Sequence, residues 1–162
     1  MGILSFIKDA GEKLFGSAPA QAQAAPTAVD VAALNKTAGD AIANYIHVQG
    51  LDAVNLLVTY DGASHTVTVS GEAADQATKE KILVAAGNVH NVEKVDDQLT
   101  VTNPAPEAQF HTVVSGDNLW KIAEKYYGSG AKNDLIFQAN TPMLKSPDKI
   151  YPGQVLVIPA VQ

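Results

Sequence analysis

The sequence predicts an α+β protein of two small domains, with the element orders αββαβ and βααβ, preceded by a short N-terminal helix. Segments of helical and strand-like apolar spacing alternate along residues 28–102, Asn103-Pro-Ala-Pro106 interrupts the pattern, and a second periodic set begins at Phe110. The 162 residues have room for one ordinary domain or two small ones. We therefore expect an N-terminal helix and linker over 1–27, a first domain over 28–102, a linker over 103–109 and a second domain over 110–160.

The N-terminal segment has apolar residues at helical spacing, namely Ile3, Ile7, Ala10 and Leu14. Gly11 weakens a helix by roughly 1 kcal/mol relative to alanine, which fits either a break that frees backbone carbonyls or a frayed helix. Lys8 and Asp9 interrupt the apolar run before it reaches the length of a signal peptide. Together with the lack of a run long enough to span a bilayer, this predicts a cytoplasmic protein. An Ala-x-Ala-like stretch at 18–24 keeps a periplasmic location as the alternative, within an Ala/Pro/Gln-rich linker.

The first domain is expected to begin with a helix that ends near Gly50. The hairpin signal Asp61-Gly62 separates two alternating strands, and Gly71 is expected to end the second of them. The predicted elements are a helix from Ala28 to about Val48, strands Val54–Tyr60 and His65–Ser70, a helix Glu72–Ala86, and a strand through Val95, Leu99 and Val101.

The second domain is expected to open with a strand that has Phe110, Thr112 and Val114 on one face. Ser115-Gly-Asp117 makes a turn that caps a helix running from near Asn118 to Gly128. A second helix over about 133–140 and a turn at Tyr151-Pro-Gly153 lead to a closing strand over 155–158.

Both ends of the second domain resemble the LysM family. Val114-Ser-Gly-Asp-Asn-Leu119 opens the segment, and Pro152-Gly-Gln-Val-Leu-Val-Ile-Pro159 closes it. The resemblance implies a βααβ fold and, in many members, recognition of N-acetylglucosamine-containing glycans such as peptidoglycan. It places the glycan between two loops, at Gly116, Asp117, Asn118, Leu119, Ile150, Tyr151 and Pro152. The glycines, prolines and Asp117 are also what these turns need in order to fold, which is the alternative interpretation.

The first domain is similar to BON domains, some of which associate with phospholipid, and the whole chain resembles bacterial BON-LysM proteins that bind potassium. The segments that carry this resemblance include 6–14, 79–88, 95–98 and 142–154. It implies a K⁺ site made of the backbone carbonyls of Ile7, Ala10, Glu12, Gly87, Val89 and Val92. Neutral carbonyls suit a large monovalent cation, because they replace its hydration shell without a carboxylate charge that would favour Ca²⁺. This chain has His90-Asn91 where such relatives have a glycine in the turn, and glycine adopts left-handed backbone at lower cost.

The remaining composition excludes several functions. The net charge of −6 and the scattered basic residues argue against a nucleic-acid partner. The chain lacks cysteine, which removes thiolate chemistry, and its four histidines have no metal-ligand spacing. Asp96 and Asp97 are adjacent on a predicted strand, so their side chains point to opposite faces of the sheet and do not make a catalytic carboxylate pair. We therefore expect a monomeric, non-enzymatic K⁺ sensor or buffer, with peptidoglycan binding through the LysM-like module or phospholipid association as the alternatives.

Overall fold

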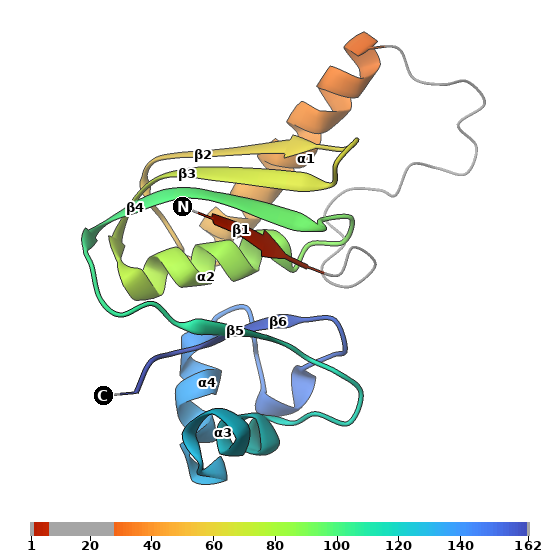
Figure 1. The fold of residues 1–162 in the computed structure, drawn as a ribbon. Helices are drawn as coiled ribbons and strands as arrows, with labels where there is room; N and C mark the ends of the chain where they lie inside the picture. Colours follow the sequence, from red (N-terminus) through yellow and green to blue (C-terminus); the bar gives the residue numbers. More distant parts are fainter. Residues whose placement is uncertain (1, 7–27, 162) are drawn as a thin grey trace.

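The computed structural model describes residues 2–6 and 28–161 of the chain. Its first domain is a four-stranded sheet in the order β1-β4-β3-β2, with two helices packed on one face (Figure 1). The strands β3 and β4 are parallel and the other neighbours are antiparallel, so α2 is the crossover between β3 and β4. The elements are β1 (Gly2–Ser5), α1 (Ala28–Val48), β2 (Val54–Asp61), β3 (Thr66–Asp75), α2 (Gln76–Gly87) and β4 (Lys94–Asn103).

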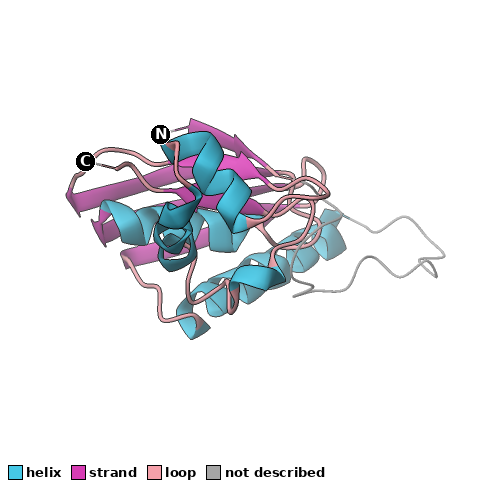
Figure 2. Ribbon diagram, turned by 90° about the horizontal axis from the view of Figure 1, so that it is seen from below, coloured by secondary structure: helices cyan, strands magenta, loops and turns pink. Residues whose placement is uncertain are grey.

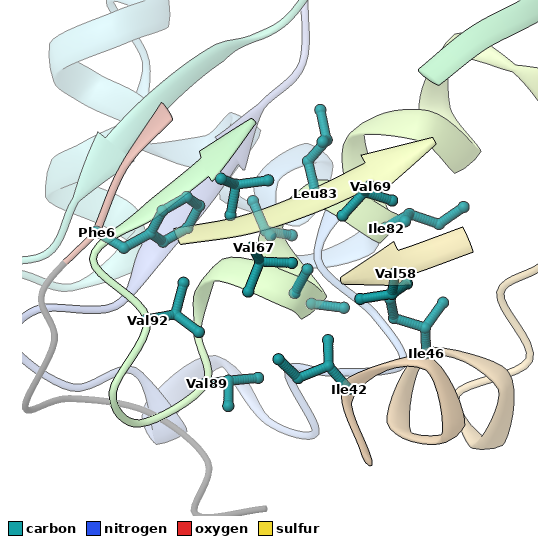
Figure 3. Close-up of a cluster of buried hydrophobic side chains, with 14 of the residues drawn as sticks. Phe6, Ile42, Ile46, Val58, Val67, Val69, Ile82, Leu83, Val89 and Val92 are labelled. Atoms are coloured by element: carbon teal, nitrogen blue, oxygen red, sulfur yellow. The ribbon is translucent and has the colours of Figure 1, made fainter. Parts of the chain in front are cut away.

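The core of this domain lies between the sheet and its two helices (Figure 3). In β2, β3 and β4 the inward-facing residues recur at every second position, as the sequence predicts. Most of them are apolar, and the charged exception is Asp97 of β4. The buried side chains drawn in Figure 3 include Ile42 and Ile46 from α1, Val58 from β2, Val67 and Val69 from β3, and Ile82 and Leu83 from α2. The mixed helix and sheet class is confirmed.

The prediction of a helix at the N-terminus is wrong for residues 2–5, which form β1. This strand pairs antiparallel with β4, and Ile3 lies opposite Asp96. Ile3 is 59% exposed, whereas Phe6 is 6% exposed. The segment therefore buries its even-numbered apolar residues, at the spacing of a strand. Its pairing covers the edge of β4, which would otherwise be unpaired. Ile7, Ala10 and Leu14, the rest of the expected helix, lie outside the described residues.

The boundary between β3 and α2 also differs from the expectation. β3 continues through Gly71 as far as Asp75, because its parallel pairing with β4 extends to Asn103. Gly71 has φ +136°, and a Cβ there would lie 2.9 Å from the carbonyl oxygen of Val54, so glycine allows the close approach of β2 instead of ending the strand. Asp75 then caps α2 by accepting a 2.7 Å hydrogen bond from the Thr78 N–H.

The second domain has the predicted βααβ order. Its elements are β5 (Gln109–Thr112), α3 (Leu119–Tyr127), α4 (Asn133–Ala139) and β6 (Val155–Ile158), with single 3₁₀ turns at Gly130–Lys132 and Pro147–Lys149. β5 and β6 are antiparallel, and a separate apolar cluster fills the space between them and the helices. Gly128 ends α3 in the left-handed conformation, as the sequence indicates. The N-cap of α3 is Asn118, not the Ser115-Gly-Asp117 turn that was expected to cap it.

The second domain packs against α2 of the first. In Figure 1 it lies below α2, and in the view from below it lies in front of the sheet (Figure 2). Val155 and Val157 of β6 belong to the same buried cluster as the first domain's core. The two domains therefore share part of one apolar core.

Candidate functional site

The turn that joins α2 to β4, residues 87–93, carries the described half of the predicted ion site. Gly87, Val89 and Val92 all lie in this α2–β4 turn. The side chains of Val89 and Val92 are fully buried, so only their backbone groups can serve a ligand. The Val92 N–H donates to the Val89 carbonyl at 3.0 Å, which closes the turn. All three of these predicted donors therefore lie within one seven-residue segment. Ile7, Ala10 and Glu12 lie outside the described residues.

The end of α2 gives this turn a negative electrostatic potential. Gly87 is the last residue of the helix, and the final carbonyls of a helix lack intrahelical partners and carry the negative end of its macrodipole. Asn88 follows as the C-cap, and its N–H donates to the Val84 carbonyl at 2.9 Å. Carbonyl oxygens gathered at such a helix end attract a cation without any carboxylate.

The N-terminal segment is anchored directly to the α2–β4 turn. The Phe6 N–H donates to the Glu93 carbonyl at 2.8 Å. The Phe6 ring occupies the space that a Cβ on Gly87 would take. Phe6, Val89 and Val92 lie on the same side of the buried cluster in Figure 3. Glycine is therefore required at position 87 by the close approach of the phenyl ring.

A second set of contacts fixes the shape of the turn at Asn91, which has φ +78°. The Tyr60 hydroxyl donates to the Asn91 carbonyl at 3.0 Å, and His65 Nδ1 lies 3.2 Å from the same oxygen. The Glu93 and Lys94 N–H groups donate to the His65 carbonyl at 2.8 and 3.1 Å. Asparagine thus adopts the left-handed backbone expected of glycine in this turn, and the β2–β3 hairpin supports that conformation.

Asn88 connects the α2–β4 turn to the second domain. Its side-chain Nδ2 donates to the Val155 carbonyl at 2.7 Å, and the Val155 N–H donates to its Oδ1 at 2.8 Å. The Asn88 side-chain amide thus bonds to the backbone of β6 in the way that a peptide group of a neighbouring strand would. A further link lies at the other end of α2, where Glu80 Oε1 accepts from the Ala108 N–H at 2.8 Å and from Gln76 Nε2 at 2.9 Å.

The two loops of the predicted glycan site also lie side by side. Val113 bonds to the C-terminal end of the 150–154 loop, because its N–H donates to the Gln154 carbonyl and its carbonyl accepts from the Gly153 N–H, each at 2.8 Å. The seven predicted residues, however, divide by role. Leu119 is buried in the domain core and Asn118 caps α3, whereas Gly116 and Pro152 are exposed and Ile150 and Tyr151 are half-buried.

Asp117 takes part in an internal network that the sequence analysis did not identify. His111 Nε2 lies 2.8 Å from Asp117 Oδ2, which also accepts from the Val114 N–H at 3.1 Å. The hydrogen bond from His111 lowers the pKa of the Asp117 carboxyl. His111 Nδ1 lies 3.1 Å from the Tyr126 hydroxyl. The inward face of the strand carries His111 and Val113, whereas Val114, on the face with Phe110 and Thr112, is 59% exposed.

Two further features are absent from the described part of the chain. Residues 2–6 and 28–161 bring no three His, Cys, Asp or Glu side chains together as a metal site. Among the helices described, none combines the length and apolar character that crossing a bilayer requires.

The chain matches two family models and two known proteins. A BON domain model matches residues 30–103, and a LysM domain model matches residues 111–159. A protein from Escherichia coli O6:H1 called potassium binding protein Kbp is 46% identical over 160 residues, which cover 98% of this chain and 99% of the relative. A spore coat assembly protein, ExsA of Bacillus cereus, is 42% identical over 52 residues, which are 32% of this chain and only 8% of that protein.

Proposed function

The chain belongs to the BON-LysM family of the potassium binding protein Kbp, and from this membership we propose that it binds K⁺ as a cytoplasmic, non-enzymatic sensor or buffer of that ion. The observation that carries the proposal is the α2–β4 turn. In it, the backbone groups of Gly87, Val89 and Val92 are held together at the negative end of a helix, and their side chains leave no charged ligand for a divalent ion.

The other donors of the proposed site are the carbonyls of Ile7, Ala10 and Glu12. The described chain supports this assignment at Phe6, whose backbone bonds to Glu93 and whose ring lies on Gly87. The sequence continues from Phe6 directly into the three proposed donors. K⁺ would then tie the N-terminal segment to the first domain, and Asn88 would pass a change in the turn to β6 of the second domain.

A titration that compares K⁺ with Na⁺ at fixed ionic strength tests the proposal. Calorimetry should show saturable heat with KCl and much weaker heat with NaCl, and amide resonances of residues 87–93 should shift with K⁺ alone. Trp120 is a poor reporter, because it is 56% exposed on α3 with its ring over Gly130, away from the turn. Equal responses to the two salts would reject selective K⁺ binding.

A substitution at Glu12 separates backbone from side-chain ligation. If its carbonyl is the ligand, Glu12→Gln keeps that carbonyl and should change the K⁺ affinity by less than about fivefold, since a charge that does not contact the ion contributes under about 1 kcal/mol. A loss of tenfold or more would show that the carboxylate is a ligand, and would replace the carbonyl site with a different one.

Glycan binding remains a second candidate, favoured by the adjacency of the 113–118 and 150–154 loops. Because Asp117 supports the fold of its own turn, Tyr151→Ala is the better test, with Trp120→Ala as a control for loss of an aromatic side chain elsewhere on the domain. Co-sedimentation with purified peptidoglycan that is lost with Tyr151→Ala and kept with Trp120→Ala would support this candidate. No retention of the intact chain would reject it.

Phospholipid association is the third candidate, and its expected basis was an amphipathic helix at the N-terminus. β1 uses residues 2–5 as an edge strand of the sheet instead. Phospholipid association is tested by comparing the liposome co-flotation of the intact chain with that of a chain that lacks residues 1–14.

A further inference from the structure

A groove lies between the two domains. It is a cleft of about 330 Å³, within the size range of small-molecule sites, and domain interfaces are a preferred place for such sites. One wall comes from Tyr45 of α1 and from Val84, Ala85 and Asn88 of α2. The opposite wall is the second-domain segment 143–154, which contributes Met143, Leu144, Lys145, Lys149, Tyr151 and Gln154. We call this space the interdomain cleft.

The lining of the interdomain cleft is cationic in a protein of net charge −6. Among the lining residues that the structure describes, Lys145 and Lys149 carry the charges, and none is an Asp or a Glu. Both lysines are exposed, and neither forms an ion pair with any described residue. Two other clefts on the molecule include Glu107 in their linings. The described lining of the interdomain cleft therefore carries a net positive charge.

The inner part of the cleft is apolar and contains an unused hydrogen-bond donor. Val84, Ala85 and Leu144 are almost fully buried and form an apolar floor. Gln154 is 7% exposed, and its side-chain oxygen accepts from the Tyr151 N–H at 3.2 Å. Its side-chain Nε2 donates to no acceptor within the described chain, and because this atom is not fully buried, its N–H is accessible to a ligand.

We propose that the interdomain cleft binds a small organic anion, with its apolar body on the Val84–Leu144 floor and its charged group between Lys145 and Lys149. A carboxylate fits best, because it can accept from two ammonium groups and from the Gln154 amide together. This site is separate from the proposed K⁺ site, which uses the carbonyls of the α2–β4 turn. Its test therefore does not depend on that proposal.

Benzoate and its neutral isostere benzamide provide matched probes. We would titrate each into the isotopically labelled full chain at fixed KCl and ionic strength, and follow the amide resonances. Benzoate should shift the amides of Val84, Leu144 and Gln154 saturably, and benzamide should bind about tenfold more weakly, since it lacks the charge. Equal binding of the two probes, or no saturable shift with benzoate, would overturn the proposal.

The lysines are tested by substitutions that preserve the fold, since both are exposed. Lys145→Gln with Lys149→Gln should weaken benzoate binding by about three- to tenfold, the range expected for two solvent-exposed charges. Lys121→Gln with Lys125→Gln, on α3, changes the net charge equally and should leave the affinity unchanged. If both double variants weakened benzoate binding equally, the effect would be one of net charge, and the assigned site would be wrong.

Discussion

The Asn88 side chain and the Val155 backbone form a two-point hydrogen bond between the domains, at 2.7 and 2.8 Å. Val155 is 4% exposed, so these bonds are made away from solvent. Gly87 and Val89 flank Asn88 in the sequence, so any change in the α2–β4 turn acts on a residue that holds β6. Asn88 therefore connects the proposed ion site to the contact between the two domains.

Asn88→Ala should therefore weaken the docking of the second domain. Both backbone groups of Val155 lose their partner, and an unsatisfied buried group costs about 1–3 kcal/mol. We expect the free energy of unfolding to decrease by an amount in about that range. The second domain can undock and let water reach Val155, which limits the loss. Urea denaturation measures this loss. Asn103→Ala is a matched control, since it removes an exposed asparagine bond within the first domain and should change stability by less than about 0.5 kcal/mol. Equal losses of stability in both variants would show that the hydrogen bonds between the domains contribute no more than an exposed bond within one domain.

Gly87→Ala should disturb the contact between the N-terminal segment and the turn. The new methyl group would overlap the Phe6 ring, and overpacking of this kind costs about 1–3 kcal/mol. If the segment supplies K⁺ ligands, the K⁺ affinity measured by calorimetry should fall together with the stability. Phe6→Leu makes room for the methyl group, so the double variant should lose less than the sum of the two single changes. Strict additivity would show that the two positions do not compete for the same space.

The sequence identifies those features of the fold that depend on neighbouring residues. Asn118 and Gly128 mark the two ends of α3, and the strand over 155–158 is observed with the expected bounds. β1 is different, because the apolar residues at its start fit a helical period through Ile3 as well as a strand period through Phe6. The edge of β4 decides between them, and that edge exists only in the folded sheet.

The candidate site is harder to predict from sequence for a physical reason. Backbone carbonyls are present in every residue, so Gly87, Val89 and Val92 carry no residue-type signal of a K⁺ ligand, and only the resemblance to a family implies them. Asn88 and Val155 are separated by 67 positions, and in the sequence Asn88 is indistinguishable from an ordinary helix C-cap. The lysines of the interdomain cleft likewise acquire their surroundings only when the domains dock.

Lys79 and Asp97 form a largely buried ion pair, with Nζ 3.0 Å from Oδ2 and both side chains 12% exposed. Lys79 also donates to the Leu99 carbonyl at 3.0 Å, and Asp97 accepts from the Leu99 N–H at 3.0 Å. Lys79→Met should destabilise the first domain by about 3–5 kcal/mol, because it leaves the carboxylate buried without a counter-charge. Adding Asp97→Asn removes that stranded charge and should recover part of the loss in urea denaturation. No recovery in the double variant would show that the lysine acts through packing alone.

Asp117 should make the second domain sensitive to acid. Its hydrogen bond from His111 lowers the pKa of the folded carboxyl below the ordinary aspartate value. Its contribution to stability is therefore fully present above that ordinary value and is lost as the pH falls through the lowered pKa of the folded state. Asp117→Asn keeps the shape but removes this titration, so the variant should be less stable near neutral pH and should lose less stability than the parent on acidification. Urea unfolding followed by Trp120 fluorescence, which reports on α3, measures both. Parallel pH profiles of parent and variant would show that the carboxylate's titration does not contribute to the stability of the second domain.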